Sequence, residues 1–251
     1  PNDVNYDAIN SVLIEDILKF SKDCLVTINE MHNVLTYNKI WKQRLVNIGT
    51  YSYKTCLEYG LTGVLARSTG LKRDLRLSRL ESYANYPTVN FRSYIGQHGD
   101  CYDRFLIRMY EMVESLHIVN QVVKKCTDTN SHTSNKSFDS YNILAYVTQE
   151  ELNKKVYNHN VTMENTINEF KYWSENIFIE PNMLSRTIES PKGEFGVTIL
   201  SDGSNKPYKV KVRSPAYHAM QLCPKISKGH FLADLVAIIG TVDIVFGEID
   251  R

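Results

Sequence analysis

The stretch GDCYDRFLIRMYEMVESLHIVNQVVKKC, from Gly99 to Cys126, carries the strongest helical pattern in the chain. Its apolar residues recur at steps of three and four, so a helix would hold them on one continuous face. Asp100 and Asp103 stand at its start and two lysines stand at its end, an arrangement that the helix dipole favours. The sequence therefore predicts a long amphipathic helix that Gly99 precedes and Asp100 caps.

Weaker helical patterns surround this helix. Residues 7–33 repeat the spacing of three and four, whereas residues 63–81 are rich in Gly, Ser and Arg and favour a loop. Residues 83–98 mix Tyr, Asn and Pro, and we expect them to be irregular. The other predicted helices cover residues 38–44, 50–59, 162–175, 215–222 and 227–239.

The hydrophobic period changes to two after Ser185. Residues 187–189, 195–200 and 208–212 alternate apolar and polar side chains, and turn residues separate them, so three short antiparallel strands are predicted. The fold class expected from the whole pattern is α+β, mainly α: a helical bundle with a small antiparallel β-meander near residues 185–213.

Residues 127–160 are dense in Ser, Thr, Asn and Lys and predict a variable surface loop. The expected organisation is a helical core over residues 1–126, then this loop, then residues 161–251. The last part would complete the same domain with a helix, the meander, a C-terminal helix and a buried tail.

The final segment, TVDIVFGEIDR, raises the question of what covers it. Chain ends are usually polar because they have little packing to hold them, yet Thr241 to Arg251 is rich in Val, Ile and Phe. We therefore expect this tail to be packed against other protein.

Composition limits the functional classes. The formal net charge is +1, so bulk charge gives no reason to propose nucleic acid or an anionic membrane surface as a partner. The five cysteines are scattered without a C-x-x-C pair, which disfavours a disulfide framework or a zinc site and favours a reducing compartment. The longest apolar run, Leu235 to Val242, is far shorter than the ~18 residues of a membrane span. A soluble or peripheral protein is expected.

Four blocks of the sequence stand out by their order and spacing: Gly99–Arg104, Glu189–Gly196, Ser201–Gly203 and Lys228–Arg251. In both respects they resemble the 49 kDa subunit family of respiratory complex I, the proton-pumping NADH:ubiquinone oxidoreductase. The resemblance extends over the whole chain apart from residues 127–160.

This resemblance carries expectations about architecture. It implies a helical bundle related to the nickel-iron hydrogenase large subunit, of which this chain is the C-terminal portion only. The N-terminal portion of the family subunit, which carries the His and Tyr thought to meet the quinone headgroup, would be a separate chain. The alternative is that this sequence is a processed or partial form of the subunit. Hydrogenases have a C-x-x-C near the C-terminus, whereas this chain ends in FGEIDR and offers no thiolates for nickel or iron.

The resemblance also implies a function. The chain would form part of the wall of the quinone-reduction cavity and would be inactive alone. Ubiquinone would be the substrate, and this chain would bind no cofactor, because the 4Fe-4S cluster lies in a neighbouring subunit. Partners would be that terminal-cluster subunit, the 30 kDa-type subunit and the separate N-terminal chain. The location would be the matrix side of the mitochondrial inner membrane or, alternatively, the cytoplasmic face of a bacterial plasma membrane.

A second function remains open: a structural or assembly fragment of the same complex, with every quinone-contacting group in the separate N-terminal chain. A free-standing enzyme of hydrogenase ancestry is disfavoured by the cysteine pattern.

Particular residues follow from the resemblance. Val245 and Phe246 would supply apolar wall to the quinone cavity, although ordinary core packing also explains them. Asp243 would be a polar or protonic group there, with a helix cap or a surface carboxylate as the alternative. Arg251 would pair charges at a buried subunit junction. Residues expected to define the fold are Gly99, Asp100, Asp103, Arg104, Gly193 and Glu194.

Overall fold

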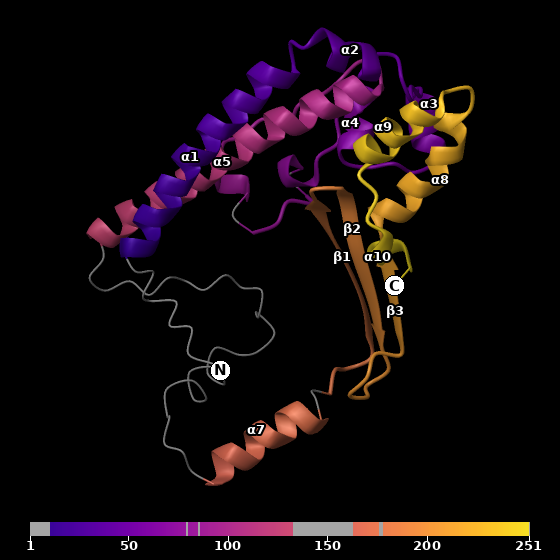
Figure 1. Cartoon of the computed structure of the whole chain (residues 1–251). Coiled ribbons are helices and arrows are strands. Elements are labelled where there is room, and N and C mark those ends of the chain that lie inside the picture. Colours follow the sequence, from indigo (N-terminus) through magenta and orange to yellow (C-terminus); the bar gives the residue numbers. More distant parts are fainter. Residues whose placement is uncertain (1–10, 79, 85, 133–162, 176–177, 251) are drawn as a thin grey trace. The chain divides into compact units, whose positions relative to one another are not determined.

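The computed structural model of the chain describes residues 11–78, 80–84, 86–132, 163–175 and 178–250 (Figure 1). The chain divides into two compact units. The first takes the chain up to His132 together with residues 187–195 and 213–251, and the second takes residues 133–186 and 196–212. The mixture of helices with one small sheet confirms the predicted α+β class. The relation to hydrogenases stays a prediction.

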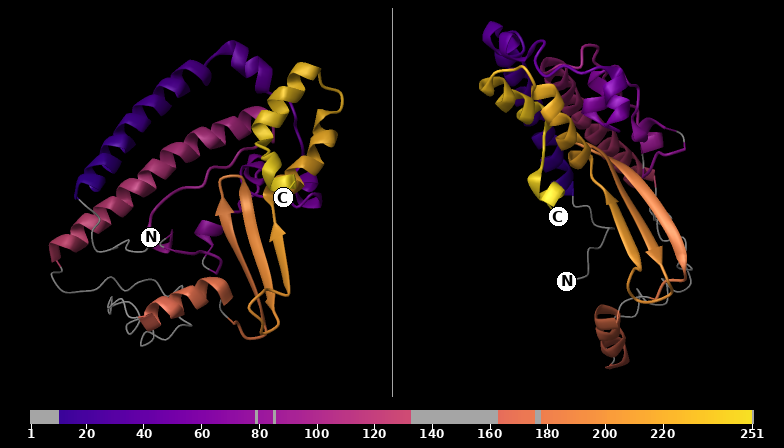
Figure 2. Two further views of the ribbon diagram at one scale, coloured as in Figure 1. Left: turned by 60° about the horizontal axis from the view of Figure 1, so that its bottom comes forward. Right: turned by 90° about the vertical axis from the view of Figure 1, so that its right-hand side faces the viewer.

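Two long helices run side by side in the first unit, α1 (Ser11–Leu35) and α5 (Cys101–His132) (Figures 1 and 2). Helix α5 confirms the strongest sequence pattern and begins immediately after its predicted cap. It continues past Cys126 to His132, so the predicted loop is wrong at its start. No Gly or Pro interrupts those residues, and nothing in them stops a helix. The rest of the predicted loop lies outside the described residues.

Short capped helices cover one end of α5. Helix α2 (Lys39–Leu45) is capped by the Asn38 side chain, which accepts a hydrogen bond from the Ile40 amide. Helix α3 (Tyr53–Glu58) is capped in the same way by Ser52. Both confirm predicted helices, because a polar residue that satisfies the first free amides is a local signal.

The loop predicted for residues 63–81 is wrong in part. Helix α4 (Val64–Ser68) lies inside it, followed by a 3₁₀ helix at Leu75–Leu77. Every residue of α4 is buried, so its packing against α3 and α5 outweighs the weak helical preference of the local composition. Residues 83–98 are irregular as expected, apart from a 3₁₀ turn at Tyr86–Thr88.

The predicted meander is present as a sheet of β1 (Asn182–Ser190), β2 (Gly193–Ser201) and β3 (Lys209–Arg213), in that spatial order. Strand β1 begins earlier than predicted, and its first residues are exposed. The turn between β1 and β2 belongs to the first unit. The second unit contains α7 (Met163–Glu175), which confirms the helix predicted there.

Three helices close the first unit: α8 (Pro215–Ser227), α9 (Leu232–Val242) and α10 (Phe246–Asp250). Helix α8 continues through Pro224 beyond its predicted end, and α9 begins later than predicted. Buried residues of α8 and α9 join the main core of the unit with side chains from α2, α3, α4 and α5. In the part of the chain that the structure describes, no helix is both long and apolar enough to span a bilayer.

Candidate functional site

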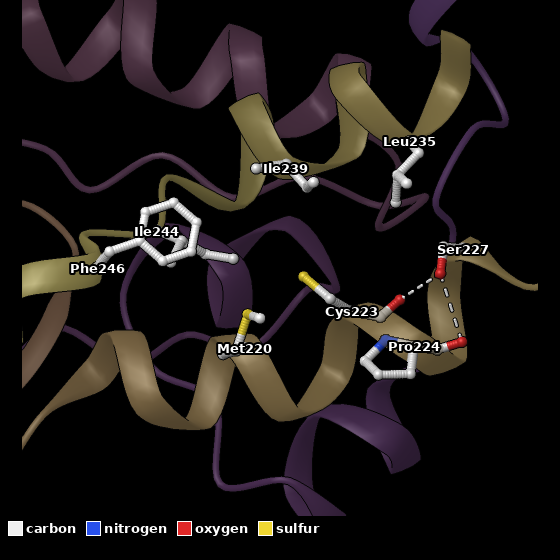
Figure 3. A pocket seen from close by; sticks show the side chains of 8 residues that line it. All are labelled: Met220, Cys223, Pro224, Ser227, Leu235, Ile239, Ile244 and Phe246. Carbon is white, nitrogen blue, oxygen red and sulfur yellow. Dashed lines mark hydrogen bonds between the residues drawn. The ribbon is translucent and has the colours of Figure 1, made fainter. Parts of the chain in front are cut away.

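A pocket of about 220 Å³ lies between α8, α9 and the segment that follows α9 (Figure 3). The two helices pack against each other, and α10 packs against α8. Helix α8 presents residues spaced by three and four, and α9 presents two residues one turn apart. The lining residues are Met220, Cys223, Pro224, Ser227, Leu235, Ile239, Ile244 and Phe246.

The pocket is almost wholly apolar in character. Its one hydroxyl, Ser227 Oγ, donates to the Cys223 carbonyl at 2.8 Å and so has its hydrogen engaged. Burial raises the pKa of the Cys223 thiol, which therefore stays uncharged at neutral pH. A cavity of about 150 Å³ is enough to hold benzene, so this one has room for a substituted ring or a short stretch of isoprenoid chain. Its side-chain donors are the engaged Ser227 hydroxyl and the weakly donating Cys223 thiol, so it offers such a ligand no strong hydrogen-bond donor.

The structure places the predicted tail residues in different positions. Phe246 lines the pocket, and 59% of its surface is exposed in this chain. Val245 and Asp243 are not among the lining residues. Asp243 instead ends α9 in a left-handed conformation (φ 60°, ψ 56°) and contacts Lys192. Arg251 lies outside the described residues.

Sequence reasoning missed most of the pocket. Ile244 and the residues from α8 and α9 were not among the predicted site residues. Their apolar spacing was visible in both predicted helices, but that spacing alone does not separate a core face from a pocket face.

Two arginines of α5 hold the end of α9. Fully buried Arg104 donates through Nε to the Thr241 hydroxyl at 3.4 Å, and Arg108 donates to the Thr241 carbonyl at 2.6 Å. This carbonyl is in the last turn of α9, where cations are favoured. Burial lowers the pKa of Arg108, although the negative charge of Asp243 opposes the shift.

The residues from Gly99 to Arg104 are held by contacts within the chain. Gly99 has φ +65°, and a Cβ there would lie 2.5 Å from the Tyr51 carbonyl oxygen. The Asp100 carboxylate accepts from the Asp103 amide at 2.8 Å, which is the predicted N-cap bond, and from the Asn47 amide at 3.1 Å. Arg104 donates to the Gly99 carbonyl at 2.9 Å. The block thereby ties the start of α5 to the loop before α3.

Gly193 and Glu194, the other residues predicted to define the fold, lie at the β1–β2 turn. A Cβ on Gly63 would lie 2.5 Å from the Gly193 Cα, so the two backbones touch. The Glu194 amide donates to the Thr62 hydroxyl at 2.9 Å. The Glu194 carboxylate pairs with Arg73 and Arg213, each at 3.1 Å. The turn is therefore fixed against the start of α4.

A buried charged cluster lies beside this turn. Arg67 contacts Glu189 at 2.8 Å, Glu111 at 2.9 Å and Asp74 at 3.8 Å, and Arg76 contacts Asp74 at 2.8 Å. Burial raises the pKa of Glu111, and the nearby arginines only partly offset it. Burial also pushes the pKa of Asp74 upward, but its hydrogen bond and charge interaction with Arg76 prevail and lower the pKa. Among the described residues, no group of His, Cys, Asp and Glu is arranged to hold a metal ion.

Comparison with known proteins identifies the family. The sequence model described as "Respiratory-chain NADH dehydrogenase, 49 Kd subunit" matches residues 4–251. A NADH-ubiquinone oxidoreductase 49 kDa subunit from Paramecium tetraurelia is 58% identical, over 100% of this chain and 62% of the relative. The 49 kDa subunit of Cafeteria roenbergensis is 41% identical, over 96% of this chain and 57% of the relative.

A bacterial relative, a NADH-quinone oxidoreductase subunit of Wolbachia pipientis wMel, is also 41% identical, over 95% of this chain and 57% of its own length. The chain thus spans about three fifths of the length of the curated relatives it matches. On these matches, the chain belongs to the family of the 49 kDa subunit of respiratory-chain NADH dehydrogenase.

Proposed function

We propose that this chain is a subunit of a proton-translocating NADH:ubiquinone oxidoreductase and forms part of the wall of its quinone-reduction cavity. The relatives are named as subunits of NADH-ubiquinone or NADH-quinone oxidoreductases. The observation that supports a quinone site in this chain is the apolar pocket whose lining includes Ile244 and Phe246.

The chemistry of the pocket supports a wall rather than a reaction centre. Reduction of a quinone to a quinol consumes two electrons and two protons. The pocket lining holds no redox group, its hydroxyl is engaged, and its thiol keeps its proton at neutral pH. Its side chains can hold an apolar ring or isoprenoid units by excluding water. Electrons would come from the 4Fe-4S cluster of a neighbouring subunit, and this chain would be inactive alone.

The other predicted tail residues enter the same proposal. Asp243, which directly precedes the wall residue Ile244 in the sequence, would supply an ionisable group beside the wall. Val245, which is partly exposed in this chain, would face the cavity once the neighbouring subunits are in place. Arg251 would lie at a junction between subunits. The proposed partners are the terminal-cluster subunit, the 30 kDa-type subunit and a separate chain with the N-terminal portion of the family subunit.

Exposed apolar side chains support burial against other subunits. Phe20 and Val34 on α1 and Phe231 and Leu232 at the start of α9 are largely exposed in this chain. We place the assembly at the matrix side of the mitochondrial inner membrane, or at the cytoplasmic face of a bacterial plasma membrane. The second candidate function, a structural or assembly fragment, is favoured by the hydrogen bonds through which Asp100, Arg104 and Glu194 hold segments of this chain together.

Replacing Phe246 by Ala in the assembled enzyme tests the proposal. A role in the cavity wall predicts an increase of about tenfold in KM for a short-chain ubiquinone analogue, because the ligand loses apolar contact worth ~1–2 kcal/mol. NADH oxidation by a hydrophilic artificial acceptor that bypasses the quinone site should not change. Phe170→Ala is the matched control, since this exposed Phe of α7 lies outside the pocket. An unchanged KM in Phe246→Ala would favour the structural fragment.

A further inference from the structure

We infer that Lys192 is a positioning residue for the quinone pocket. It holds the junction between α9 and α10 and thereby sets where Ile244 and Phe246 stand in the pocket wall. The inference rests on the proposed function and adds to it a residue from the β1–β2 turn, far away in the sequence.

The junction, residues 243–245, begins with a residue in an uncommon conformation. Asp243 has φ 60° and ψ 56°, and its amide still donates to the Ile239 carbonyl at 3.1 Å. Left-handed backbone costs an L-residue roughly 1–2 kcal/mol, although Asp tolerates it better than most. The next residue, Ile244, already lines the pocket, and Phe246 begins α10. The orientation of this one residue therefore directs the wall segment.

The Lys192 ammonium group contacts both the side chain and the backbone of Asp243. Its Nζ lies 2.7 Å from Asp243 Oδ1 and 3.3 Å from the Asp243 carbonyl oxygen. The side chains of Lys192 and Asp243 are 26% and 41% exposed, and ion pairs this exposed contribute only ~0–1 kcal/mol to stability. An interaction of this size contributes little to the stability of the whole fold. It is enough to favour one orientation of the junction at Asp243 over another.

The base of Lys192 is rigid. Its own amide donates to the Ser190 hydroxyl at 3.3 Å. Gly193, the next residue, touches the backbone of Gly63, and Glu194 is bonded to Thr62. Because the turn cannot move without breaking these contacts, the core of the unit fixes the backbone position from which the Lys192 side chain extends to Asp243.

The rest of the segment is held from other sides. Arg104 and Arg108 bind Thr241 from the core, and the Ser214 hydroxyl donates to Glu248 of α10 at 2.7 Å. Between these two anchored points, and among the described residues, Asp243 forms a side-chain ion pair with Lys192. Its loss would let Ile244 and Phe246 shift while both ends stay in place.

Three variants of the assembled enzyme test this inference. Lys192→Met keeps the length and apolar stem of the side chain but removes its charge. Asp243→Asn removes the carboxylate but keeps a residue type that tolerates left-handed backbone, and Lys192→Arg retains a cation at position 192. KM and kcat are measured with a short-chain ubiquinone analogue, and NADH oxidation with a hydrophilic acceptor serves as the control for assembly.

We expect Lys192→Met and Asp243→Asn each to raise the quinone KM about fivefold, with the hydrophilic-acceptor rate within about twofold of wild type. For Lys192→Met, which changes no group proposed to exchange protons, kcat should also stay within about twofold of wild type. The double variant should be no worse than either single variant, since one contact is lost in all three. Lys192→Arg should return the KM to within about twofold of wild type.

The possible failures are distinguishable. If Phe246→Ala raises the quinone KM and Lys192→Met does not, the inference is wrong and the proposed function stands. If neither changes the KM, the proposed function fails. Parallel loss of hydrophilic-acceptor activity in Lys192→Met, or additive effects in the double variant, would show a role other than positioning and overturn the inference.

Discussion

The β1–β2 turn and the pocket between α8 and α9 both reach the segment from Asp243 to Phe246, but they are built differently. The turn joins it through the Lys192–Asp243 ion pair. The turn itself is held by the touching backbones of Gly63 and Gly193 and by the two arginines that pair with Glu194. The pocket joins it through apolar side chains and leaves open space.

This difference predicts where the molecule tolerates change. A backbone contact or a buried ion has one acceptable partner geometry, so its loss leaves a clash or an unpaired charge. An apolar surface beside open space can rearrange, and its residues are free to serve a ligand. The predictions that follow test this contrast from the largest expected effect to the smallest.

Gly63→Ala should cause the largest loss. The residue has φ +68° and ψ −142°, and the new Cβ would stand 2.5 Å from the Gly193 Cα. We expect the free energy of unfolding of the purified chain to fall by about 3–5 kcal/mol, measured by denaturant titration. Gly60→Ala is the control, because Gly60 also has positive φ but nothing within 4 Å of its Cβ position, so about 1 kcal/mol is expected. Equal losses would contradict the backbone contact.

Arg67→Met should cost about 3–4 kcal/mol in the same measurement, since it leaves Glu189 and Glu111 without the arginine they share, whereas Asp74 keeps Arg76. Arg73→Met removes an arginine whose side chain is half exposed, and Glu194 keeps Arg213 as a partner. The expected loss there is below ~1 kcal/mol. A small effect at Arg67 would mean that the cluster contributes little to the rigidity of the turn.

Within the apolar region, Ile238→Ala and Phe246→Ala should separate core from pocket. Ile238 is fully buried, and its truncation should cost about 2–4 kcal/mol of unfolding free energy. Phe246 is largely exposed in this chain, so its truncation should cost less than ~1 kcal/mol while impairing quinone use. Comparable losses of stability would place Phe246 in the core and remove its assignment to the wall.

The smallest effect is a pH dependence at Glu111. Its pKa is raised in the folded state, so the folded state holds the proton more tightly than the unfolded state does. The stability that the proton contributes is present below the ordinary pKa of Glu and is lost as pH rises through the raised value. Glu111→Gln cannot titrate and should show a flatter pH profile of unfolding free energy across that window. Asp74, whose pKa is lowered, titrates below this pH window in both the wild-type chain and Glu111→Gln. Identical profiles would contradict the assignment.

Much of the fold was predictable because its signals are local. The face of α5 repeats with the helical period, Asn38 and Ser52 satisfy the first amides of α2 and α3, and the meander alternates with period two. Helix α4 was not predictable. Its five residues are too few to show a period, and burial rather than composition makes them helical.

The sequence by itself determined the long helix, the strands and, through resemblance to a family, the tail residues Asp243 and Phe246 as candidates. Only the tertiary structure decided that Phe246 shares a pocket with Met220 and that Lys192 reaches Asp243 across 51 positions of the chain. Periods and caps describe neighbours within one or two turns. Which distant surfaces meet depends on how the whole core packs, and no local pattern contains that information.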